Sequence, residues 1–132
     1  MDEITQRYID LISRAIIDNI NRVAEKYLKD NKRKLIIFYT MKCEFCMKYL
    51  DELKKYDEQF RDKPEYISYE LFDTEKEEYY QFAKALKFKG IPTTAFVNEY
   101  NRIVLLVGGV IPYDKIIETA TKIYETKISD NV

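Results

Sequence analysis

The sequence predicts an α/β fold in which helices flank a four-stranded mixed sheet and an extra long helix comes first. Three observations predict it. Apolar residues recur at three- and four-residue steps in several long segments, short apolar runs lie between those segments, and a hairpin-like pair of runs comes late in the chain. The predicted order is α-β-α-β-α-β-β-α. Its β-α-β part should be parallel and right-handed, with helices on both faces of the sheet.

The first part of the chain is expected to form a helix, a strand and a second helix. A helical apolar pattern covers about 3–30, and the polar, basic stretch 29–33 ends it. The run 34–40 is too short for a helix and rich in isoleucine and aromatic residues, so it should be a buried strand. The segment 43–60 again places apolar residues on one helical face, and Pro64 closes the following turn.

The middle of the chain predicts a second strand and a third helix. The segment 66–72 alternates in the manner of a strand. Asp73 and the acidic residues after it suit the first turn of a helix, because side-chain oxygens and negative charge are favoured there. We expect that helix to run to about Phe88 and to end at Gly90.

The last part of the chain predicts a hairpin and a closing helix. Two apolar runs, 93–97 and 102–107, are joined by the turn-like residues 98–101. The pair Gly108-Gly109 breaks the second run. A final helix should cover about 112–127, since proline suits its first turn.

Composition and charge exclude several functional classes. The 132 residues suit one folded domain, because 46% are hydrophobic and 12 are tyrosines. Interleaved charges with a net value of −1 give no basic surface for nucleic acid. The apolar runs are shorter than the roughly 20 residues of a membrane span. The acidic N-terminus lacks signal-peptide character, so we expect a cytoplasmic protein. Without histidine, neither a histidine-dependent nucleophile nor a histidine metal ligand is possible.

The motif Cys43-Glu44-Phe45-Cys46 contains the only two cysteines of the chain. It follows a predicted strand and opens a predicted helix. Residues three apart on a helix face each other, at a separation compatible with a disulfide. The free N–H groups and dipole of the helix N-terminus favour the thiolate form of Cys43. In the cytoplasm such a pair is more often catalytic or metal-binding than structural, and we interpret it as a redox site.

Other interpretations of these residues stay open at this stage. The two cysteines could be half of a zinc site shared across a dimer, or inert residues of the core. Pro92 could be a trans residue that starts a strand. Gly108-Gly109 could leave room for a substrate chain beside Pro92 or form an ordinary turn. We expect no metal site, and no cofactor other than a redox-active Cys43–Cys46 disulfide.

The cysteine motif together with Gly90-Ile91-Pro92-Thr93 resembles the thioredoxin superfamily over roughly 34–127. The resemblance implies one thioredoxin-like domain over 1–132, in which 1–31 form an added helical extension. It implies that the Ile91–Pro92 bond is cis and packs against the cysteines. It also implies that the backbone of Ile91 binds the substrate chain. Apart from the resemblance, Gly108 and Gly109 are further candidate residues of the substrate site.

The sequence departs from that family at its most informative positions. Thioredoxins have Trp-Cys-Gly-Pro-Cys, whereas Lys42 precedes the first cysteine here and Phe45 resembles the aromatic residue of glutaredoxin motifs. Thioredoxins also carry a buried acid six residues before the first cysteine, and Ile37 takes that position. Lys42 and Lys48 should favour the thiolate, and Glu44 should oppose it.

The expected function is a thiol–disulfide oxidoreductase that reduces protein disulfides by electron transfer from its cysteines. The nucleophile would be Cys43 and the resolving thiol Cys46. An oxidase or isomerase of the same fold and a redox-inactive adaptor are the alternatives. The expected partners are protein disulfides and an upstream reductase, without nucleic acid or membrane. We expect a monomer whose first helix packs on the sheet, unless that helix docks a partner or a second copy.

Overall fold

The computed structural model describes residues 17–130. In this part of the chain, four strands form one mixed sheet in the order β2-β1-β3-β4. The strands are β1 Lys34–Tyr39, β2 Tyr69–Asp73, β3 Thr93–Val97 and β4 Ile103–Gly108. β1 runs parallel to β2 and antiparallel to β3, and β3 forms a hairpin with β4. The predicted four-stranded mixed sheet flanked by helices is therefore confirmed.

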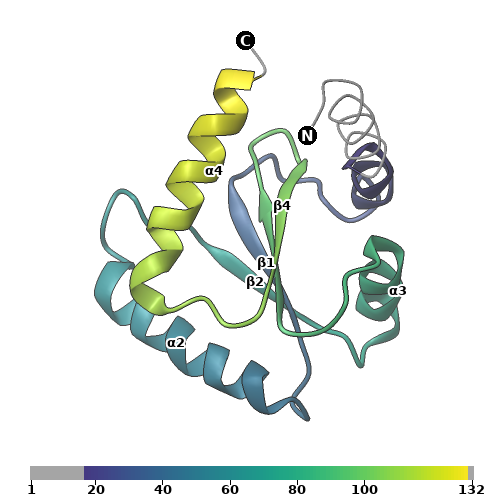
Figure 1. Ribbon diagram of the computed structural model, residues 1–132, viewed down its shortest axis with the longest axis horizontal. Helices are drawn as coiled ribbons and strands as arrows, with labels where there is room; N and C mark the ends of the chain where they lie inside the picture. Colours follow the sequence, from purple (N-terminus) through teal and green to yellow (C-terminus); the bar gives the residue numbers. More distant parts are fainter. Residues whose placement is uncertain (1–16, 131–132) are drawn as a thin grey trace, which may run out of the picture.

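Helices cover both faces of this sheet (Figure 1). The helices α2 and α4 lie on one face, and α3 and the N-terminal helix lie on the other. Their bounds are α2 Glu44–Phe60, α3 Glu77–Leu86 and α4 Ile116–Asp130, with a 3₁₀ turn η1 Tyr113–Lys115 before α4. None of the helices described is long and apolar enough to cross a membrane.

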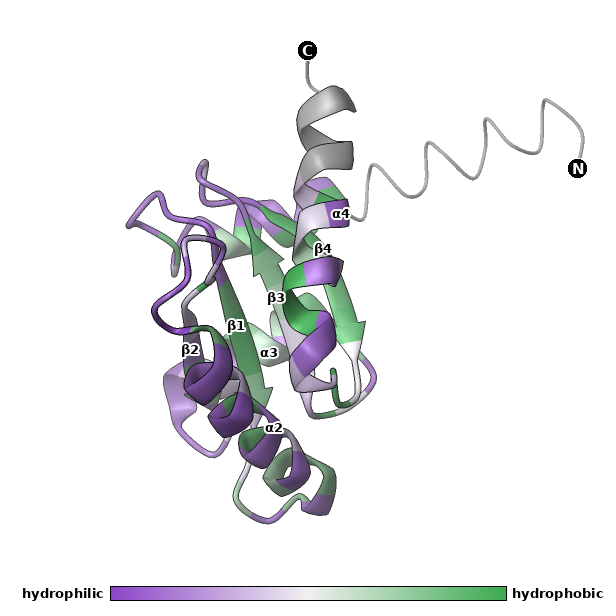
Figure 2. Ribbon diagram, turned by 90° about the vertical axis from the view of Figure 1, so that its left-hand side faces the viewer, coloured by the Kyte–Doolittle hydropathy of each residue, from purple (hydrophilic) through white to green (hydrophobic). Residues whose placement is uncertain are grey.

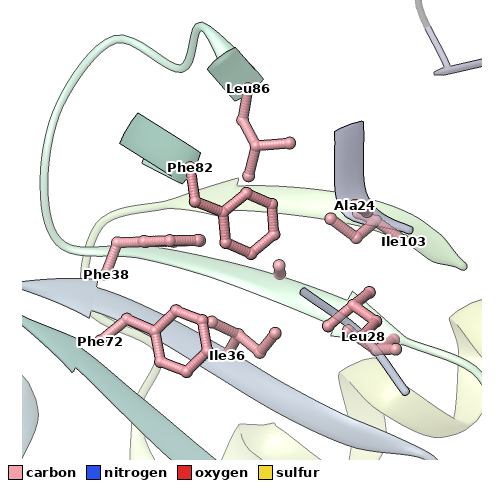
Figure 3. Close-up of a cluster of buried hydrophobic side chains, with 10 residues drawn as sticks. Ala24, Leu28, Ile36, Phe38, Phe72, Phe82, Leu86 and Ile103 are labelled. Carbon is pink, nitrogen blue, oxygen red and sulfur yellow. The ribbon is translucent and has the colours of Figure 1, made fainter. Parts of the chain in front are cut away.

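Alternate residues of each strand supply the two cores, because successive side chains of a strand point to opposite faces. On the α2 side, Leu35, Ile37 and Phe96 pack against residues of α2 and α4. On the other side, β1 contributes Ile36 and Phe38. Figure 3 shows this second core, and its labelled members are Ala24, Leu28, Ile36, Phe38, Phe72, Phe82, Leu86 and Ile103. Figure 2 shows the strands mostly in the colour of hydrophobic residues, with hydrophilic residues gathered on loops and outer helix surfaces.

The N-terminal helix is attached to β4 by one buried side chain. Asn21 Oδ1 accepts a hydrogen bond from the Ile103 N–H at 2.7 Å, and Asn21 Nδ2 donates to the Ile103 carbonyl oxygen at 3.4 Å. The same amide group donates to the Ile17 carbonyl oxygen at 3.1 Å. The expected packing of this segment on the sheet is seen, since Ala24 and Leu28 enter the core.

The N-terminal helix ends earlier than predicted. Among the described residues it covers 17–24, whereas the apolar pattern predicted a helix over about 3–30, of which 1–16 lie outside the described residues. The chain tightens into a turn here, because Lys26 N–H bonds the carbonyl of Val23 and Tyr27 N–H bonds that of Ala24. Leu28 follows this turn and is buried in the core. Its place in the sequence therefore extended the helical spacing of apolar residues beyond the end of the helix.

The bounds of β2 and α3 also differ from the prediction. β2 starts at Tyr69. The Tyr56 hydroxyl accepts a hydrogen bond from the Ile67 N–H and donates one to the Ile67 carbonyl oxygen, so these backbone groups of Ile67 are not available to a neighbouring strand. Asp73 ends β2, and its carboxylate accepts from the Glu75 N–H in a turn instead of starting a helix.

The prediction that Gly90 ends the third helix was wrong. α3 closes after Leu86 with Lys87 in the left-handed conformation, at φ 59°. The last helix likewise starts later than predicted, at Ile116, and Pro112 precedes the 3₁₀ turn before it.

Candidate active site

The first cysteine caps the N-terminus of α2. A short turn after β1 places it there, and its N–H donates to the Thr40 carbonyl oxygen at 3.2 Å. Its backbone is extended, at φ −98° and ψ 118°, and Cys43 Sγ accepts a hydrogen bond from the Cys46 N–H at 3.2 Å. The sulfur therefore serves one of the free donors of the helix end. The same donor is available to a thiolate at this position.

The second cysteine lies beneath the first. Cys46 is fully buried, Cys43 is partly exposed, and both are free thiols. Cys43 is therefore the more exposed of the two cysteines. Burial, together with a hydrogen bond and a charge contribution from Cys43, raises the pKa of the Cys46 thiol to about 11. Cys46 is consequently a protonated thiol at neutral pH.

The Pro92 loop faces the first cysteine. The Ile91–Pro92 peptide bond is cis, and the Cys43 thiol donates to the Ile91 carbonyl oxygen, with 3.7 Å between the sulfur and the oxygen. Pro92 itself is buried and half-buried Ile91 lies beside it. Residues that are 48 positions apart in the chain thus meet at one sulfur atom.

The two glycines lie against the same loop. Gly108 is the last residue of β4 and pairs with Thr93, and the Gly109 N–H donates to the Pro92 carbonyl oxygen at 2.8 Å. Gly109 has φ +91°, a conformation that side chains disfavour, whereas a Cβ at Gly108 would meet no atom within 4 Å. Together with Ile91 and Pro92, both glycines line an open hollow of about 430 Å³.

The charged and aromatic residues of the motif lie around the sulfur at the surface. Lys42 Nζ lies 3.3 Å from Glu75 Oε1, but its side chain is 84% exposed, so this ion pair stabilises little. Phe45 is 61% exposed, and Lys48 Nζ lies 5.2 Å from the centre of its ring. Glu44 is the acidic residue of the first turn of α2. The side chains of Lys42, Glu44, Phe45 and Lys48 form a mixed polar and apolar rim of the site.

Sequence reasoning missed one exposed residue of this rim. Met41 is 62% exposed and lies two positions before Cys43. No pattern marks a single methionine in a turn, although its place between a buried strand and the motif was a usable signal.

An apolar residue, Ile37, occupies the position at which thioredoxins carry a buried acid. Ile37 is fully buried, as expected, and pairs in register with Thr94 of β3. Among the described residues, no Asp or Glu side chain is buried. Two of the buried polar groups on this side of the sheet are the hydroxyls of Tyr49 and Thr94, both at 0% exposure and 2.8 Å apart. Sequence reasoning missed this pair.

No group of three or more cysteine, aspartate or glutamate side chains that could hold a metal ion occurs among the residues the structure describes. The geometry brings together Cys43, Cys46, Ile91, Pro92 and the glycine pair. A nucleophilic sulfur lies at the surface, a second thiol lies within reach below it, and a backbone carbonyl and a hollow lie beside it. This arrangement suits exchange between thiols and disulfides.

Comparison with known proteins agrees with the fold described above. The family model of the thioredoxin-like domain matches residues 20–123. No curated protein matches the chain. A solved structure of an uncharacterized thioredoxin-like protein from Clostridium perfringens is 19% identical, with 72% of this chain and 73% of that chain covered and a TM-score of 0.57.

Two thioredoxins are similar to this chain as well. The Aeropyrum pernix thioredoxin is 17% identical, with 81% of this chain and 82% of that chain covered and a TM-score of 0.56. Thioredoxin f from spinach chloroplast is 25% identical, with 74% of this chain and 82% of that chain covered and a TM-score of 0.54. The first of these two likenesses, like that to the Clostridium protein, concerns the fold alone.

Proposed function

This chain belongs to the thioredoxin-like domain family, and its cysteine pair supports a function of the thiol–disulfide oxidoreductase type; from that premise we propose that it reduces disulfide bonds in protein substrates. The observation that carries the proposal is the position of Cys43 Sγ. This sulfur lies 3.2 Å from the Cys46 N–H nitrogen and 3.7 Å from the Ile91 carbonyl oxygen, above a buried second thiol.

The proposed reaction has two exchange steps. The Cys43 thiolate attacks one sulfur of the substrate disulfide, and the other substrate sulfur leaves as a thiolate that takes a proton from water. Cys46 then loses its proton and attacks Cys43, which forms the Cys43–Cys46 disulfide and expels the second substrate thiolate. The substrate gains two electrons and the cysteine pair loses them. An upstream reductase must return those electrons before the next cycle.

The residues around the sulfur suit an extended substrate segment. Met41 and Phe45 are exposed apolar side chains on the cysteine side of the site. Ile91, Gly108 and Gly109 border the hollow on the other side, and we propose that the Ile91 backbone holds the substrate chain there. A reductase of this kind works in a reducing compartment such as the cytoplasm, where thiols persist.

The test is the equilibrium reduction potential of the cysteine pair, titrated in glutathione buffers and read by thiol alkylation. A value near about −270 mV supports a reductase. A value between about −180 and −120 mV points to an oxidase or isomerase instead. If no disulfide forms between the two cysteines, the proposal fails and a redox-inactive adaptor takes its place.

Two variants assign the roles of the cysteines in reduction of a disulfide-bonded protein. Cys43→Ser should abolish turnover, whereas Cys46→Ser should stop after the first step and accumulate a mixed disulfide with the substrate, visible by mass spectrometry. Reduction that survives Cys43→Ser at the wild-type rate contradicts the mechanism.

A further inference from the structure

Thr40 shapes the turn that carries the first cysteine. This half-buried residue directly follows β1, and its carbonyl oxygen accepts a hydrogen bond from the Cys43 N–H at 3.2 Å. Its hydroxyl oxygen accepts one from the Lys42 N–H at 3.3 Å. A hydroxyl at the first position of a turn commonly bonds the backbone two residues further on. Together these two bonds hold the four residues from Thr40 to Cys43 in one conformation.

The start of this turn is anchored to the segment that follows β2. Thr74 donates two hydrogen bonds to the Tyr39 carbonyl oxygen, from its N–H at 2.9 Å and from its hydroxyl at 3.1 Å. Tyr39 is the last residue of β1 and lies opposite Asp73, the last residue of β2. The residue before Thr40 is therefore held on the sheet, and the turn has a fixed starting point.

Thr40 also contacts the second cysteine. Burial raises the pKa of the Cys46 thiol most strongly, whereas a hydrogen bond with the Thr40 backbone lowers it. A hydrogen bond lowers the pKa of a thiol when it is donated to the thiolate, and the N–H is the only donor of the backbone. The Thr40 N–H therefore donates to the Cys46 sulfur. Thr40 thus bonds both cysteines, Cys43 through its carbonyl oxygen and Cys46 through its N–H.

We propose that Thr40 is a positioning residue for the cysteine pair: the turn that it closes holds Cys43 close to Cys46, and its backbone N–H stabilises the Cys46 sulfur as that sulfur becomes a thiolate. This inference rests on the proposed function, because it concerns the second exchange step. A hydrogen bond to a charged group is among the stronger ones. The first attack uses the Cys43 sulfur alone, so it does not depend on this donor.

A small aromatic disulfide, dithiobis(nitrobenzoate), separates the two steps. The Cys43 thiolate attacks it, one thionitrobenzoate leaves, and the other stays bound to Cys43 as a mixed disulfide. Cys46 then loses a proton to water, attacks Cys43 and expels the second thionitrobenzoate. The probe gains two electrons and the protein is left with a disulfide. In stopped-flow absorbance, the first release depends on probe concentration and the second does not.

An ester in place of the amide at Thr40 removes the N–H and keeps the side chain. A synthetic segment 1–42, which carries the α-hydroxy analogue of threonine at position 40, is ligated to residues 43–132 at Cys43. We expect its second release to be at least about threefold slower at about pH 7.5, with the first release unchanged. Loss of the donor lowers the fraction of Cys46 thiolate more than it raises the nucleophilicity of that thiolate. The all-amide protein made by the same ligation is the reference.

Side-chain variants are the matched controls. The ester also makes the Tyr39 carbonyl oxygen a weaker acceptor. Thr74→Val removes the hydroxyl bond to this same oxygen, and it should leave the second release unchanged. Thr40→Val removes the hydroxyl that closes the turn and should slow the second release about threefold. Thr40→Ser keeps that hydroxyl and should restore the wild-type rate.

The outcomes distinguish this inference from the proposed function. A wild-type protein with no second release overturns the proposed function, and Cys46→Ser is the control for that absence. A normal wild type combined with an unchanged second release in the ester protein overturns only the inference. Equal slowing of both releases, or an equal effect of Thr74→Val, overturns it as well. If the ester protein does not fold, a second release that is slower in Thr40→Val than in Thr40→Ser supports the inference, and equal rates overturn it.

Discussion

Replacing Ile37 with aspartate would put a carboxyl group at the position where thioredoxins carry a buried acid. In this chain the side chain of Ile37 is fully buried and lies in register between Leu71 and Thr94 on the neighbouring strands. No buried carboxylate or buried cation lies among its neighbours in the packed cluster on this face. Ile37→Asn is the matched control, because it has a similar shape and polarity but does not ionise.

The burial of Ile37 sets how much each substitution should lower the free energy of unfolding. Both variants lose the burial of an isoleucine, about 1.5–3 kcal/mol. The introduced carboxyl group also meets desolvation, which raises its pKa in the folded state above its unfolded value of about 3.9. Folded protein then binds more protons than unfolded protein above about pH 4. The free energy of unfolding must therefore fall as pH rises, by about 1.4 kcal/mol per pH unit, until the folded pKa is passed.

Urea unfolding of Ile37→Asp and Ile37→Asn at about pH 5, 6 and 7 measures this effect. The difference between the two variants should grow from pH 5 to pH 7, by up to about 2.7 kcal/mol when the folded-state pKa lies above this range. That loss is large against a total stability of about 5–15 kcal/mol. The Asn variant should show no such trend, since its side chain does not titrate.

A difference that stays constant with pH would refute the reasoning. It would mean that the carboxylate is hydrated or paired at this position, and hence that the core around Ile37 on the α2 face is not dry.

Three other outcomes follow from polar groups that are buried or partly buried. Because burial raises the pKa of Cys46 to about 11, its attack on a mixed disulfide should accelerate about tenfold per pH unit from about pH 6 to about 9 in stopped-flow measurements. Tyr124→Phe should lower the free energy of unfolding by about 1 kcal/mol in urea, since the Tyr124 hydroxyl donates to the Val97 carbonyl oxygen at 2.8 Å. Burial and then the hydrogen bond and charge of Asp57 raise the pKa of Tyr66 to about 12. Asp57→Ala should therefore lower that pKa in an absorbance titration, although burial keeps it above the ordinary value.

Each of these outcomes has a control or a contradicting result. A rate of resolution that levels off well below pH 9 would contradict the buried state of Cys46. Tyr100→Phe is the control for Tyr124→Phe, because Tyr100 is 70% exposed and its loss of a hydroxyl should leave stability unchanged. An unchanged titration of Tyr66 in Asp57→Ala would show that the hydrogen bond between them contributes nothing.

The sheet was predictable because its strands are short apolar runs bounded by polar residues. The run before Cys43 formed β1 almost as predicted, Lys34–Tyr39, and the hairpin of β3 and β4 followed its turn residues. Helix ends were harder to predict. Lys87 takes a left-handed conformation that sequence rules assign to glycine, and Asp73 bonds within a turn instead of capping a helix.

Part of the candidate site was predictable from spacing, since Cys43 and Cys46 are close in sequence and Pro92 lies in a recognisable loop. The hydroxyl pair of Tyr49 and Thr94 was not. These two residues are 45 positions apart and meet only because β3 pairs with β1 beneath α2. Neither residue type marks a site by itself, so only the assembled fold reveals their contact.

The bonds of Asn21 to Ile103 also bear on how this protein behaves among its own copies. β4 is one of the two outermost strands of the sheet, and an outermost strand offers unpaired N–H and C=O groups that can pair with another molecule and start aggregation. The amide of Asn21 occupies both groups of Ile103 in place of a neighbouring strand. Shortening the protein past Asn21 would uncover this strand, so designs meant for high concentration should keep the N-terminal helix.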